Sequence, residues 1–69
     1  MNPPTYEVEI GNSTLAFVYN VPTLAEAQDI ARLALPIYKS TIIIRHVTEC
    51  FGHERKQTIA RIEYRPDPT

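Results

Sequence analysis

One stretch of the sequence, residues 23–35, has the periodicity of an amphipathic helix and separates two stretches that alternate like strands. Thr23 and Glu26 have the spacing of a capping box, in which a hydroxyl and a carboxylate each satisfy a backbone N–H at the start of a helix. Because Pro36 cannot donate the next backbone hydrogen bond, we expect the helix to end at about Leu35. The apolar stripe recurs every three or four residues and consists of Leu24, Ala27, Ile30, Ala31, Ala34 and Leu35.

The sequence before this helix predicts a β-hairpin. Residues 6–10 and 15–19 alternate between inward and outward side chains, and the Gly-Asn-Ser turn signal at 11–13 lies between them. A loop of two residues and a loop of four residues both place the apolar side chains of the two strands on one face. These side chains are Tyr6, Val8, Ile10, Leu15, Phe17 and Tyr19.

A second hairpin is expected after the helix. Residues 41–47 include three consecutive isoleucines and are apolar on both faces, which favours a strand inside the sheet. Residues 58–64 alternate again, and a turn is expected within residues 50–53, with strands that extend to Glu49 and resume near Glu54 as the alternative. Residues 36–40 are expected to be a connector.

These elements predict an α+β fold of order β-β-α-β-β, with a four-stranded antiparallel sheet and one helix packed on one face. Residues 1–69 are expected to form a single domain with loose ends at 1–5 and 65–69. One helix covers only one face of such a sheet, so the other face stays open. On this open face we expect Glu7, Glu9, Ala16, Val18, Ile59, Arg61 and Glu63, with either Ile43, Arg45 and Val47 or Ile42, Ile44 and His46.

The size of the chain and its single cysteine limit how it can be stabilised. A chain of 69 residues buries only about 60% of the surface that its unfolded form exposes, so such domains often depend on a partner subunit. Cys50 cannot form a disulfide within the chain, which favours a cytoplasmic setting. No signal peptide and no membrane-spanning segment are expected.

Charge is distributed unevenly along the chain. Residues 1–31 contain four acidic residues and no lysine or arginine, whereas residues 32–69 contain seven basic and four acidic residues, a net charge of +3. One interpretation is a basic patch that meets nucleic acid or an acidic partner. The other is that the two halves neutralise each other across neighbouring strands.

The pattern of potentially reactive residues does not predict catalysis. His46, Cys50 and His53 match no common zinc-binding spacing, and they supply only three of the four ligands that a structural zinc site needs. Glu7 and Glu9 could resemble a pair of acid/base carboxylates, but two glutamates separated by one residue are typical of the solvent-facing side of a strand. No glycine-rich phosphate loop is present. We therefore expect no enzyme activity, no metal and no cofactor.

Binding to another molecule is the function that the sequence favours. An aliphatic and charged surface on the open face would suit a protein partner or a second copy of this chain. Nucleic acid is the alternative partner, bound by the basic second hairpin, although the signature of the RNA-recognition motif is absent. The expected partner-binding residues are Val18, Ile43, Arg45, Arg55, Lys56, Ile59 and Arg61.

The helix entry Thr23-Leu24-x-x-Ala27-x-x-Ile30-Ala31, set between two hairpins, resembles very small phage-encoded proteins, including anti-CRISPR proteins of type I systems. This resemblance implies an inhibitor that occupies a partner's surface without catalysis. The Thr-Leu-x-Glu-Ala entry is also similar to antitoxins of the HicB type, which neutralise a toxin through a protein interface. The four-strand order departs from the antitoxin pattern, and no functional residue carries over from either family.

Overall fold

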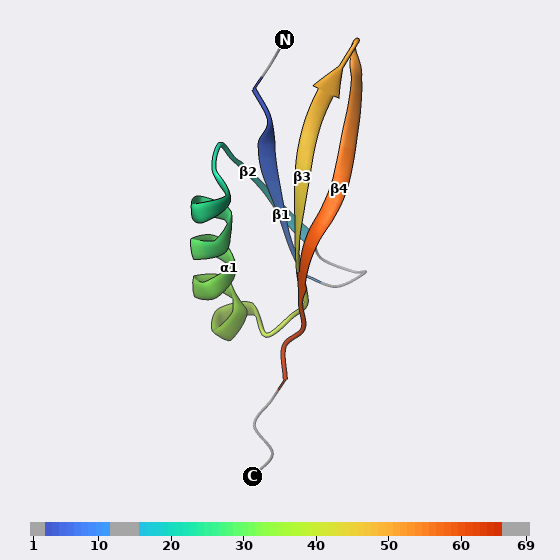
Figure 1. Cartoon of the computed structure of the whole chain (residues 1–69). Helices are drawn as coiled ribbons and strands as arrows, with labels where there is room; N and C mark the ends of the chain where they lie inside the picture. Colours follow the sequence, from blue (N-terminus) through green and yellow to red (C-terminus); the bar gives the residue numbers. More distant parts are fainter. Residues whose placement is uncertain (1–2, 12–15, 66–69) are drawn as a thin grey trace.

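A computed structural model describes residues 3–11 and 16–65 and has the expected order β-β-α-β-β (Figure 1). Its elements are β1 (Thr5–Gly11), β2 (Ala16–Val21), α1 (Leu24–Tyr38), β3 (Ile42–Cys50) and β4 (His53–Ile62). The strands form one antiparallel sheet in the order β2-β1-β3-β4. The predicted α+β fold is therefore confirmed, and β3 lies inside the sheet as its isoleucines indicate.

The core lies between α1 and the two central strands. Strand register pairs Val8 with Tyr19 and Ile10 with Phe17, so the apolar residues of the first hairpin share the helix-facing side, as predicted. The pairing of Gly11 with Ala16 leaves the longer, four-residue connection. Leu15 falls outside the described residues. The buried core consists of Val8, Ile10, Ala27, Ala31, Ala34, Ile42 and Ile44.

One of the two hydrogen bonds of the predicted capping box is present at the start of α1. The backbone N–H of Glu26 donates to Thr23 Oγ1 over 3.2 Å, as an N-cap requires. The Glu26 carboxylate accepts from the Thr23 hydroxyl at 3.1 Å, whereas a complete capping box directs it to the Thr23 backbone N–H.

The predicted end of the helix at Leu35 is wrong, because α1 continues through Pro36 to Tyr38. Pro36 lies one turn from the end and is exposed, so its ring leaves only one backbone hydrogen bond unmade. The last turn closes when the Lys39 N–H donates to the Leu35 carbonyl over 3.0 Å. Lys39 adopts a left-handed conformation, φ 51°, which is the usual way to end a helix.

The strands of the second hairpin extend closer to its tip than predicted, since the main prediction placed the turn across residues 50–53. Strand β3 continues to Cys50, β4 starts at His53, and the turn consists of Phe51 and Gly52 alone. Both turn residues have positive φ, the conformation that matches the twist of two paired strands. At its other end β4 stops at Ile62, two residues before the predicted Tyr64.

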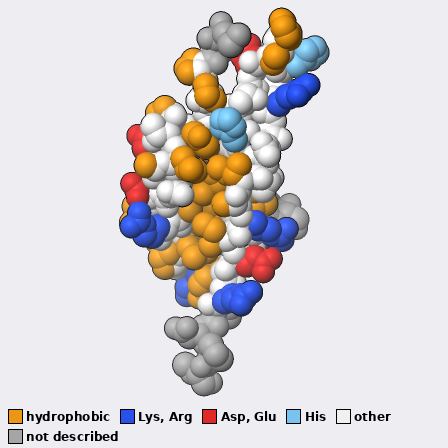
Figure 2. Space-filling model, in the orientation of Figure 1, with side chains coloured by type: hydrophobic (Ala, Val, Ile, Leu, Met, Phe, Trp, Pro, Cys, Tyr) orange, Lys and Arg blue, Asp and Glu red, His pale blue; other side chains and the backbone are white. Residues whose placement is uncertain are grey.

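Helix α1 does not cover the whole sheet. It packs mainly against β1, with smaller contacts to β2 and β3 and none recorded to β4. Figure 2 shows apolar side chains in the seam that this position leaves between α1 and β4. In the described part of the chain, no helix has both the length and the apolar character that spanning a bilayer requires.

Candidate protein-binding surfaces

The centre of the open face is a network of ion pairs. Arg45 Nη1 lies 3.1 Å from Glu7 Oε1 and 3.3 Å from Glu9 Oε1, because the register places Arg45 directly opposite Glu7 on the neighbouring strand. Lys56 Nζ reaches the other oxygen of Glu7 over 2.8 Å. Glu7 thus bridges two cations, and only 7% of its surface is exposed.

The bridge stabilises the ionised form of Glu7. The hydrogen bond from Lys56 is the largest cause that lowers the pKa of the Glu7 carboxyl; it outweighs the opposing effect of burial, and Arg45 adds to it. The same hydrogen bond raises the pKa of Lys56. The Arg45 pairs bear out the expectation that acidic residues of the first half neutralise basic residues of the second half across neighbouring strands, and the Lys56 pair extends this from β1 to β4.

The structure brings most of the predicted partner-binding residues to the open face. It selects Ile43, Arg45 and Val47 for this face, since Ile42 and Ile44 are buried beneath α1. Arg61 lies opposite Ile43, and its Nε is 3.4 Å from Glu63. Lys56 on β4 and Val18 on β2 also lie on this face, whereas Ile59 is left without a partner residue by the register shift in β4.

Two of the predicted partner-binding residues lie apart from the rest. Val18 is on the edge strand β2, two strands away from β3. Arg55 lies beside the hairpin tip, opposite Thr48, and strand alternation directs it away from the face that carries Lys56. With Arg45 and Lys56 committed to Glu7, the open face presents mixed charge rather than a basic patch.

An exposed apolar surface that the sequence did not predict lies where α1 meets β2. We call Phe17, Tyr19, Leu33, Ile37 and Tyr38 the apolar edge. Leu33 and Ile37 are 69% and 72% exposed, and the rings of Phe17 and Tyr38 contact each other with centroids 5.7 Å apart. A groove of about 270 Å³ runs through this surface over Ile10, Ile30 and Ala34. A sequence signal existed, since Leu33 and Ile37 are one helical turn apart and lie off the predicted stripe.

A second exposed apolar feature is Phe51 at the tip of the β3–β4 hairpin. Its side chain is 96% exposed, and its φ of 52° is uncommon for a residue with a bulky side chain. Figure 1 shows that the tip extends beyond α1 at one end of the molecule. No strand in the described part of the chain lies beside the residue pairs beyond Val47–Lys56, because β1 begins at Thr5 opposite Val47.

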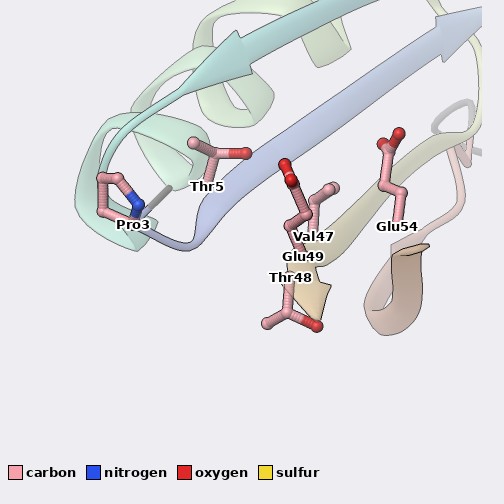
Figure 3. A pocket seen from close by; sticks show the side chains of 6 residues that line it. All are labelled: Pro3, Thr5, Val47, Thr48, Glu49 and Glu54. Atoms are coloured by element: carbon pink, nitrogen blue, oxygen red, sulfur yellow. The ribbon is translucent and has the colours of Figure 1, made fainter. Parts of the chain in front are cut away.

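Carboxylates flank the base of this tip. Glu49 and Glu54 are directly opposite each other in the strand register. Figure 3 shows both side chains on the same side of the hairpin as Val47, with Thr48 on the other side. Together with Pro3 and Thr5 these residues line a shallow hollow of about 340 Å³. The tip therefore combines an apolar end with carboxylates on one side and Arg55 on the other.

The residues considered for metal binding or catalysis lie along the second hairpin. The ring of His46 packs on Tyr6, with centroids 5.0 Å apart. Cys50 is exposed and is paired with His53 across the turn. It lies four residues beyond His46 on β3, which is a distance of about 13 Å along the strand. Within residues 3–11 and 16–65, no three histidine, cysteine, aspartate or glutamate side chains gather where they could hold one metal ion.

Comparisons of the chain with protein-family models, curated proteins and solved structures found no match. The candidate sites therefore rest on the geometry of the chain itself.

Proposed function

We propose that this protein acts by binding another protein without catalysing a reaction, and that Phe51 is the residue that enters the partner. A surface inhibitor of the anti-CRISPR kind, which the sequence resemblance implies, would work in this way, and so would an adaptor. The single observation that carries the proposal is an almost fully exposed aromatic ring held in a left-handed turn.

Neither the fold nor its stability accounts for phenylalanine at this position. A left-handed backbone costs a residue with a side chain about 1–2 kcal/mol, and asparagine or glycine is preferred in this turn position. The ring also gains nothing by burial, because it is 96% exposed. A strained residue with no structural benefit is a reason to infer a function, and buried aromatic residues are frequent anchors in protein interfaces.

The charges near the tip are of both signs and do not form the basic surface that phosphate contacts use. Glu54 would repel phosphate groups brought up to Phe51, Arg55 on the other side of the hairpin would attract them, and an exposed aromatic ring can stack on a base. A partner that suits this tip has an apolar pocket for the Phe51 ring. Arg55 is the basic residue nearest to Phe51 in this hairpin, whereas Lys56 is already bound to Glu7.

The substitution Phe51→Asn tests the proposal because it separates binding from stability. Asparagine relieves the backbone strain and removes the ring, so we expect the thermal midpoint to stay the same or rise. A photo-crosslinking amino acid at position 51 would first identify the bound protein in source cells, with the same amino acid at exposed Leu24 as the control. Affinity for that purified protein should then fall more than tenfold in Phe51→Asn and be kept in Phe51→Tyr.

Two results would contradict the proposal. One is an identified partner that binds the wild type and Phe51→Asn equally well. The other is salt-dependent binding of a single-stranded oligonucleotide, measured by fluorescence polarisation, that Phe51→Asn abolishes, since this result would make base stacking the role of the ring.

A further inference from the structure

Strand β2 is an unprotected edge of the sheet. It ends the strand order β2-β1-β3-β4, so one of its sides presents backbone N–H and C=O groups that no other described strand pairs with. Its residues, Ala16–Val21, include no charged side chain and no proline, and its pairing with β1 has no bulge. Nothing in β2 discourages another strand from pairing with it.

The other edge of the sheet is different. Strand β4 carries charged side chains along its length, and the register shift between Ile44 and Arg45 leaves Ile59 as a bulged residue. Charges and bulges on an edge strand are the usual protection against edge-to-edge pairing. The chain thus protects β4 and leaves β2 open. The charged residues of β4 are Glu54, Arg55, Lys56 and Arg61.

We infer that β2 pairs with β2 of a second copy of this chain, antiparallel and around a two-fold axis. The two four-stranded sheets would then continue into one another through a β2–β2 pair. A two-fold interface brings the same surface from both copies together, so that surface must complement itself. An uncharged strand meets this requirement, because self-pairing brings no like charges together.

The same two-fold axis explains the apolar edge. It leaves both α1 helices on one side of the joined sheet, because the axis runs perpendicular to that sheet. Each helix lies mainly over β1, and the two β1 strands would be three strand spacings apart, about 14 Å. Helices in direct contact are only about 8–10 Å apart, so the space above the paired β2 strands needs filling. Phe17 and Tyr19 rise from β2 into this space, and Leu33 and Ile37 of each helix line it.

This inference concerns a different surface from Phe51, and it also differs from dimerisation through the open face. The ion-pair network around Glu7 occupies the open face, whereas the largest group of exposed apolar side chains is at the apolar edge. A dimer through β2 would leave both hairpin tips free, since the tip belongs to β3 and β4 at the other side of the sheet.

Two variants with the same chemical change decide between the two edges of the sheet. Ile37→Glu introduces a charge into the apolar edge, and Ile59→Glu introduces one into β4 at the opposite edge of the sheet; both residues are exposed in a single copy. We expect the wild type to have a dimer mass by light scattering and sedimentation at micromolar concentrations. Ile37→Glu should have a monomer mass and an unchanged circular dichroism spectrum, and Ile59→Glu should remain a dimer.

Hydrogen exchange gives a second readout that does not depend on a variant folding. Amides of β2 should exchange more slowly as the protein concentration rises through the dissociation constant, whereas amides of β4 should not change. A monomer at all accessible concentrations would overturn the inference. A dimer broken by Ile59→Glu but not by Ile37→Glu, or one whose β2 amides do not become protected, would overturn it as well.

Discussion

At the scale of single residues, Glu7 shows what the sequence predicts and what it leaves open. Alternation in β1 places Glu7 on the open face, and the structure confirms this placement. The bridge from Glu7 to Arg45 and Lys56 depends on the register between β1 and β3 and on the bulge at Ile59. Strand register and bulges follow from contacts between distant segments, so local pattern alone does not determine them.

The bridge makes a prediction about acid stability. Because the folded pKa of Glu7 lies below its unfolded value, the ionised carboxylate stabilises the fold above the unfolded pKa, and this contribution is lost as the pH falls through the lower folded pKa. Glu7→Gln should lower the free energy of unfolding at pH 7 by about 1–3 kcal/mol. The difference from wild type should shrink in urea titrations from pH 7 towards pH 3.

A suitable control for this experiment is Glu54→Gln. Glu54 is exposed and its carboxylate is 3.8 Å from Lys56 Nζ, so its removal should change stability little. A Glu7→Gln protein that matches the wild type at pH 7, or whose difference grows as the pH falls, would show that the bridge does not contribute as described.

At the scale of elements, the sequence locates the helix and strands better than their ends. The capping residue Thr23 marks the start of α1 correctly, because the N-cap is a local interaction. The end of α1 is not set by a local signal in the same way. The helix continues past Pro36 to Tyr38, and the left-handed Lys39 caps it. Likewise, the exposure of Leu33 and Ile37 depends on how α1 lies over β1, which the helical periodicity alone does not give.

The left-handed cap predicts that Lys39→Gly stabilises the protein. Glycine adopts positive φ without the steric cost that lysine bears, and the bond from residue 39 N–H to the Leu35 carbonyl can remain. We expect the free energy of unfolding, measured with urea, to rise by about 1 kcal/mol. Lys39→Ala is the matched control, because alanine keeps the β-carbon and should bring no such gain. Equal stability of the two variants would contradict this explanation of the cap.

At the scale of the whole molecule, the sequence predicts the fold class but not which surface is free to bind. Both hairpins, the central position of β3 and the open face follow from alternation and from the limited coverage of a single helix. The apolar edge depends on strand order, since it exists only because β2 is at the margin of the sheet. Two of the residues predicted to contact a partner through the open face, Arg45 and Lys56, already form ion pairs with Glu7.

If two copies join through β2, the stability of the protein must depend on its concentration. Among the described residues, the core of one copy contains seven buried apolar side chains, three of them alanines, so the shared apolar edge would add a large part of the buried surface. For a dimer that unfolds to separate chains, a tenfold rise in concentration should raise the thermal midpoint by roughly 5 °C. Ile37→Glu should have a midpoint that does not move with concentration, and Ile59→Glu should behave like the wild type in calorimetry. A wild-type midpoint that stays constant over a hundredfold range would show that each copy is stable alone, and the exposed Leu33 and Ile37 would then need another explanation.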